Sequence, residues 1–109
     1  MTEAVEFESL GNGRFIVSGD LSFATAEVAL DEGERLFEHF QEIDLDFAHL
    51  GKTDSAGLAV LIEWISRANR DGKEIRFHGL PGQLHALAEI SEVEDLLPLA
   101  RSEAVEAGN

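Results

Sequence analysis

Cysteine is absent from this chain of 109 residues. Its absence excludes disulfides, thiolate metal sites and cysteine nucleophiles. Long hydrophobic runs are absent as well, because the longest one, from Ala56 to Ile62, is far too short to cross a bilayer. No basic segment followed by an apolar core opens the sequence, so we do not expect a secretion signal. These absences make a cytoplasmic protein the default expectation.

Basic residues are scarce. Eight lysines and arginines stand against 22 aspartates and glutamates, which gives a formal net charge of −14 and a pI near 4.4. A nucleic-acid backbone or an anionic membrane surface would be repelled by this charge. The acidity therefore favours either a simply well-solvated surface or a protein partner with a basic face.

The length fits one compact domain, which we place at residues 1–100, followed by a polar, acidic C-terminal tail at 101–109. Alternating apolar residues predict strands, and apolar residues at helical spacing predict helices. The predicted strands cover 5–10, 14–18, 43–47 and about 75–77, and the predicted helices cover 25–40, 55–71 and 81–90. The order β-β-α-β-α-β-α predicts an α/β domain with a mixed four- to five-stranded sheet and helices packed on one face.

The segment between the third strand and the second helix is the best candidate site. It places the hydroxyl of Ser55, the carboxylate of Asp54 and free backbone N–H groups at one helix N-terminus. Two interpretations stay open. These residues can simply cap the helix, or Ser55 can be a phosphate acceptor or contact residue. Because Asp54, Asp46 and Asp44 would repel an added phosphate, phosphorylation would act as a disruptive switch.

Catalytic and metal sites receive weaker support. Asp44 and Asp46, together with Asp54, could hold magnesium as in a receiver domain, but a solvated strand face explains them as well. A receiver domain also needs a lysine late in the chain, and the only lysines are Lys52 and Lys73. The four histidines show no ligand spacing, and no G-x-S-x-G elbow is present.

The second predicted helix carries more apolar residues than a core-facing stripe needs. Val60 and Trp64 fall to one side of that stripe, at about 100° per residue. Trp64 can pack against the first helix or a loop, or it can be an exposed anchor in a protein interface, where tryptophan is enriched.

The strand and turn together resemble the signature of STAS domains, the fold of bacterial anti-sigma factor antagonists. The resemblance is carried by Ile-Asp-Leu-Asp at 43–46 and Asp-Ser-Ala-Gly-Leu at 54–58, and it extends from the strand around Phe7 to about Leu99. The family motif reads Asp-Ser-Ser-Gly, and its first serine is phosphorylated by a partner kinase in the antagonists. Ser55 matches that serine, whereas Ala56 replaces the second one.

The C-terminal half resembles a narrower group, the MlaB-like STAS subunits of Mla-type phospholipid transporters. The similar segments are Leu-Pro-Gly-Gln-Leu-His-Ala-Leu-Ala-Glu-Ile at 80–90, Val-Glu-Asp-Leu-Leu-Pro at 93–98, Leu-Ile-Glu-Trp at 61–64, and Arg67-Ala68. This resemblance implies a small non-catalytic cytoplasmic subunit without a cofactor, held at the inner membrane by docking on the ATPase of an ABC transporter. The implied contact surface, with the helix extension suggested above, comprises Thr53, Asp54, Ser55, Ala56, Gly57, Leu58, Val60 and Trp64.

Three functions are therefore weighed. The first is an accessory subunit that stabilises or regulates the ATPase of a phospholipid-transport complex maintaining outer-membrane lipid asymmetry. The second is an anti-sigma factor antagonist switched by phosphorylation of Ser55, with an anti-sigma factor kinase as its partner. The third, a small catalytic or metal-dependent phosphotransfer domain, has the least support. Ala56 and the pattern from Leu84 to Pro98 favour the first.

Overall fold

A computed structural model describes residues 2–99. The elements follow the predicted order and are, in sequence, β1 (Glu6–Gly11), β2 (Arg14–Leu21), α1 (Ala26–Phe37), β3 (Glu42–Thr53), α2 (Ser55–Arg70), β4 (Glu74–His78), α3 (Gly82–Ile90) and a 3₁₀ turn, Glu94–Leu96. The α/β fold class and the element order predicted from the sequence are confirmed. The predicted tail at 101–109 lies outside the described residues. Within residues 2–99, no helix has the length and apolar character needed to cross a bilayer.

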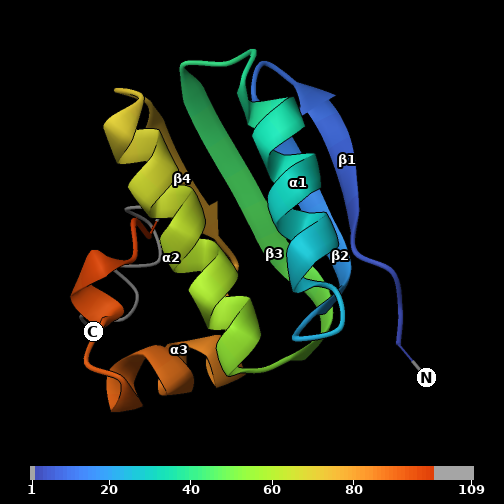
Figure 1. The fold of residues 1–109 in the computed structure, drawn as a ribbon, viewed down its shortest axis with the longest axis vertical. Helices are drawn as coiled ribbons and strands as arrows, with labels where there is room; N and C mark the ends of the chain where they lie inside the picture. Colours follow the sequence, from blue (N-terminus) through green and yellow to red (C-terminus); the bar gives the residue numbers. More distant parts are fainter. Residues whose placement is uncertain (1, 100–109) are drawn as a thin grey trace.

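The sheet is mixed. Its strand order is β1-β2-β3-β4, with β1 antiparallel to β2 and with β2, β3 and β4 parallel to one another. The tight turn between β1 and β2 needs positive φ angles, which Gly11, Asn12 and Gly13 supply at +89°, +56° and +78°. Figure 1 shows α1 and α2 lying side by side across one face of this sheet, with α3 at the end where α2 begins.

Alternation along β3 explains why only one face is covered. Ile43, Leu45 and Phe47 are buried beneath the helices, whereas Asp44 and Asp46 lie on the opposite face. The helices match this apolar face with stripes of their own, because α2 buries residues at helical spacing. Those residues are Gly57, Leu58, Val60, Leu61, Trp64 and Ala68.

Two strands run further than the sequence predicts. Strand β2 continues to Leu21 and β3 continues to Thr53, through residues expected to form a polar turn. Parallel pairing extends both strands, since Leu21 pairs with Thr53 after two shifts of register. The connection from β3 to α2 is therefore a single residue, Asp54. Strand pairing with a distant segment overrides local polarity here.

The remaining corrections to the predicted elements are small. Helix α1 ends at Phe37 rather than near residue 40. Pro81 occupies the N-cap of α3, with φ −59° and ψ 146°, and the helix itself starts at Gly82. Gly72, with φ +68°, follows the C-cap of α2, Asp71.

Candidate functional site

The site is built around the carboxylate of Asp54, the N-cap of α2. Its Oδ1 accepts hydrogen bonds from the backbone N–H groups of Ala56, at 2.9 Å, and Gly57, at 3.1 Å. Its Oδ2 accepts a hydrogen bond from the N–H of Phe23, at 3.1 Å, in the loop between β2 and α1. One side chain thus caps α2 and fixes a loop 31 residues earlier in the chain.

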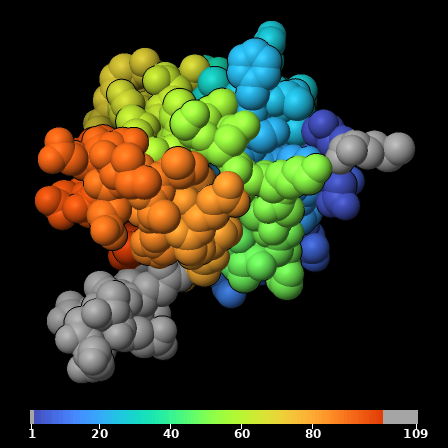
Figure 2. Space-filling view, turned by 90° about the horizontal axis from the view of Figure 1, so that it is seen from below, coloured from blue at the N-terminus to red at the C-terminus, as the bar shows by residue number. Residues whose placement is uncertain are grey.

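Gly57 allows the first turn of α2 to lie directly against the end of β2. A Cβ atom at this position would stand 2.1 Å from the carbonyl oxygen of Leu21. On the other side, the side-chain amide of Gln83 in α3 donates to the carbonyl of Thr53, at 2.9 Å. The beginning of α2 is therefore held between the loop before α1 and the beginning of α3. Figure 2 shows these three segments on one face, with α2 in lime between α3 in orange and the loop before α1 in light blue.

Ser55 is the exposed centre of this arrangement. Its side chain is open to solvent, and its hydroxyl has no hydrogen-bond partner among residues 2–99. Asp54 and Ala56 on either side are half-buried. Within the described residues, no general base is hydrogen-bonded to this hydroxyl.

The other predicted contact residues lie deeper. Thr53, Gly57 and Leu58 are buried, and the hydroxyl of Thr53 has no hydrogen-bond partner within residues 2–99. The interpretation of Val60 and Trp64 as surface extensions is wrong, because each is only 2% exposed. Because both side chains are buried, neither offers a surface to a partner.

Trp64 belongs to an aromatic cluster instead. Its ring meets those of Phe37 and Phe7 edge to face, with centroids 5.4 Å and 5.8 Å apart. Gly33 in α1 makes room for it, since a Cβ there would be 2.7 Å from the indole nitrogen. Of the two interpretations of Trp64, packing against the first helix is therefore the correct one.

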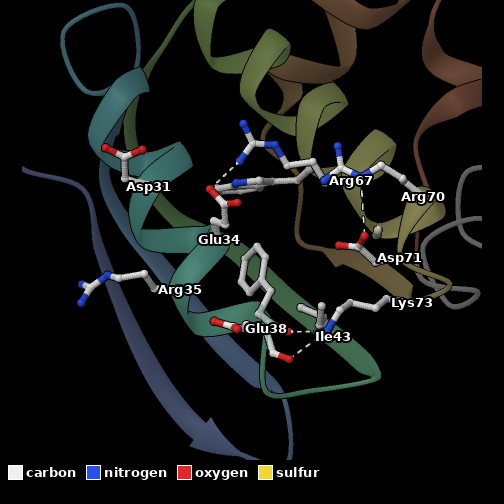
Figure 3. Close-up of a pocket in the computed structure, with 12 residues that line it drawn as sticks. Asp31, Glu34, Arg35, Glu38, Ile43, Arg67, Arg70, Asp71 and Lys73 are labelled. Atoms are coloured by element: carbon white, nitrogen blue, oxygen red, sulfur yellow. Dashed lines mark hydrogen bonds and ion pairs between the residues drawn. The ribbon is translucent and has the colours of Figure 1, made fainter.

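A cleft lies at the opposite end of α2 from Ser55. It has a volume of about 630 Å³, with an apolar floor that includes Phe37 and Trp64 and a rim of charges of both signs. The rim cations already have partners: Arg67 pairs with Glu34 and Glu63, and Arg70 pairs with Asp71. The ammonium group of Lys73 donates to three backbone carbonyls at the end of α1, at 2.7–3.1 Å. Figure 3 shows Arg67 directed toward Glu34, Arg70 toward Asp71 and Lys73 toward the end of α1. Arg67 thereby joins α2 to α1, and Lys73 joins the end of α1 to the segment after α2.

The three aspartates considered as magnesium ligands have separate partners. Both carboxylate oxygens of Asp44 accept hydrogen bonds from Arg76, at 2.9 and 3.1 Å, and Oδ1 also lies 2.8 Å from Nε2 of His78. Arg76, and to a smaller extent His78, lower the pKa of Asp44 below its usual value of 3.8. Asp46 accepts the N–H of Ala48, and Asp54 caps α2. Within residues 2–99, no group of three or more acidic, histidine or cysteine side chains could hold a metal ion.

Sequence reasoning missed Phe23. It is 84% exposed and lies beside Asp54, which binds its N–H. The one available signal was an aromatic residue among small residues, in Leu-Ser-Phe-Ala-Thr at 21–25, between a strand and a helix.

Solved structures with the same fold come from bacterial regulators and from a transporter. The Bacillus cell fate determinant SpoIIAA in its phosphorylated form matches with a TM-score of 0.65 at 13% identity, over 96% of this chain and 99% of that one. An anti-sigma factor antagonist from Mycobacterium paratuberculosis matches with a TM-score of 0.65 at 14% identity, over 94% and 91%. The murine anion transporter Slc26a9 matches with a TM-score of 0.58 at 18% identity, over 84% of this chain but 16% of that one. These likenesses define the class as a STAS-like domain.

The family is narrower than the fold. A family model described as "Mlab, STAS domain" matches residues 9–98, and the chain belongs to this family. A search of curated proteins found no match. The resemblance to STAS domains drawn from the sequence is thereby confirmed.

Proposed function

We propose that this protein is a non-catalytic STAS subunit that binds the ATPase of an inner-membrane phospholipid-transport ABC complex and stabilises or regulates it. In this role it contributes to outer-membrane lipid asymmetry from the cytoplasmic side and reaches the membrane only through its partner. The observation that carries the proposal is the exposed hydroxyl of Ser55, set at the start of α2 by the Asp54 cap. The match to the "Mlab, STAS domain" family model supports the choice of a phospholipid transporter as the partner complex.

The rigidity of the site supports a binding role. Asp54 connects the start of α2 to the loop before α1, and Gln83 connects it to α3, so the surface around Ser55 is preorganised. A preorganised surface loses little conformational entropy on association. By binding one state of the ATPase more tightly than another, the subunit would shift that partner toward the assembled state.

An anti-sigma factor antagonist remains the second candidate, for one reason. Ser55 is accessible to a kinase, and the phosphorylated SpoIIAA structure shares the fold. A phosphate on Ser55 would lie next to the carboxylate of Asp54, and the like charges would repel each other. In this alternative, phosphorylation releases the partner. The replacement of the second motif serine by Ala56 favours the transporter subunit instead.

Affinity purification of the tagged chain from its native cells separates the two candidates. We expect the ATPase of a phospholipid transporter among the co-purifying proteins, at a stoichiometric level. Deletion of the gene for this chain should then lower the amount of assembled transporter and increase the phospholipid exposed on the cell surface. Recovery of a kinase-like anti-sigma factor without a transporter ATPase would overturn the proposal and support the alternative.

A further inference from the structure

We propose that Phe23 is the apolar anchor of the Ser55 docking surface, and that it enters an apolar pocket with a basic rim on the partner protein. This inference rests on the proposed function and deepens it by naming the partner's chemistry. At 84% exposure, Phe23 is more exposed than the other large apolar side chains of residues 2–99. Aromatic residues in such positions are over-represented among the residues that dominate binding energy.

The loop that carries Phe23 is held by its own hydrogen bonds. The hydroxyl of Thr25, which is buried, donates to the carbonyl of Asp20 at 2.8 Å and accepts the N–H of Ser22 at 3.0 Å. Asp54 binds the N–H of Phe23 itself, at 3.1 Å. The ring is therefore presented from a fixed backbone next to Ser55, rather than from a loose loop. Fixing the backbone in advance lowers the entropy lost when the ring becomes buried in a partner.

The surface beside this anchor suits close approach. Ser55 and Ala59, one turn apart on α2, are both exposed and small. Val28, early in α1, adds an apolar side chain that is 59% exposed. The ring of Phe23 would fit a pocket on the partner, and the small side chains of α2 beside it would let a raised part of the partner surface approach closely.

The charge of the chain indicates that the partner at this surface is a different protein and not a second copy of this chain. The net charge is −14, so two copies repel each other. Near the anchor, Asp54 and the exposed Glu27 are acidic, and an anionic lipid surface would be repelled as well. A protein with lysines or arginines around an apolar pocket matches both features of this surface.

The first test is titration calorimetry with the purified transporter ATPase. We expect Phe23→Ala to weaken binding by about tenfold or more, as for an interface hot spot. Leu10→Ala is the matched control, because Leu10 is 46% exposed on β1 near the start of β2, whereas Phe23 follows the end of β2. This variant should change affinity less than about twofold. Equal melting temperatures would establish that both variants fold. If Phe23→Ala binds within twofold of wild type, the anchor is wrong while the proposed function stands.

A second test separates failure of the anchor from failure of the proposed function. A photo-crosslinking phenylalanine analogue is placed at position 23, at position 59 or at position 10 in native cells. A crosslink from position 23 to the ATPase supports both proposals. A different result would separate the two proposals: wild type does not bind the ATPase, and position 23 crosslinks to an anti-sigma factor kinase. If the Phe23→Ala variant then binds that purified kinase more weakly than wild type does, the proposed function fails and the anchor stands. Crosslinks from position 59 alone, absence of crosslinks, or self-crosslinks from position 23 overturn the anchor.

Discussion

The two ends of α2 differ in what surrounds them. At the N-terminal end, a carboxylate caps the helix and small side chains such as Ser55 and Ala59 face solvent. Toward the C-terminal end, the ring of Trp64 is buried among other aromatic rings, and Arg67 is paired with glutamates. One helix therefore contributes core packing along its length, while small side chains in its first turns are open to solvent. The comparison teaches that the wide apolar stripe of α2 reflects packing in the core, not a protein interface. The exposed small residues near its start mark the candidate surface instead.

The largest expected effect on stability comes from Trp64→Ala. Removing the ring leaves a cavity beneath α1, and we expect the free energy of unfolding to fall by about 3–5 kcal/mol. The affinity of the folded fraction for the partner should stay unchanged. Urea unfolding followed by calorimetry checks both quantities, and Trp64→Phe serves as a milder variant if the alanine variant does not fold. A loss of affinity in folded protein would mean that the two ends of α2 are not separate.

Gly57→Ala probes the other end. The added methyl group would meet the carbonyl oxygen of Leu21 at 2.1 Å, so backbone must move, and we expect a loss of about 2–3 kcal/mol. Because the movement would shift the start of α2, affinity should fall as well. Gly82→Ala is the matched control: it lies at the start of α3, where a Cβ meets nothing within 4 Å. Similar melting temperatures for the two variants would contradict the close approach at Gly57.

A smaller effect on stability is expected away from both ends of α2, on the open face of the sheet. Arg76 lowers the pKa of Asp44, so the ionised carboxylate stabilises the fold above its usual pKa of 3.8. This stabilisation is lost as the pH falls below 3.8 and through the lowered pKa of the folded state. Because Arg76 is 42% exposed in its side chain, the contribution is at most about 1 kcal/mol.

Asp44→Asn measures that contribution. The difference in unfolding free energy between wild type and variant should be present at pH 7 and should shrink as the pH is lowered from about 4.5 to 2.5. Urea unfolding across this range provides the measurement. A difference that stays constant with pH would show that the ion pair does not act through the charge of Asp44.

The sequence predicted the fold well because its signals were periodic. Alternating apolar residues such as Ile43, Leu45 and Phe47 identified the strands, and apolar residues at helical spacing identified the helices, from local chemistry alone. The ends of β2 and β3 could not be predicted, because pairing between Leu21 and Thr53 joins segments distant in sequence.

For the candidate site, the sequence predicted a capped helix start but left open which residue caps it, and the structure shows that it is Asp54. The sequence could not decide the burial of Trp64, since the space for the ring depends on Gly33 in another helix. Nor could it find Phe23, whose position depends on a hydrogen bond to Asp54 across 31 residues. Both features arise from contacts between elements, which no local pattern encodes.

The most direct test of the docking role compares Ser55→Asp with Ser66→Asp. Both serines are exposed on α2, but Ser66 lies toward the far end of the helix. We expect both variants to unfold within about 0.5 kcal/mol of wild type, as surface substitutions do. In calorimetry against the transporter ATPase, Ser55→Asp should weaken binding by about tenfold or more, because a desolvated extra charge beside Asp54 costs free energy at an interface. Ser66→Asp should bind like wild type. Equal affinity for the two folded variants would contradict the assignment of the Ser55 turn as the docking point.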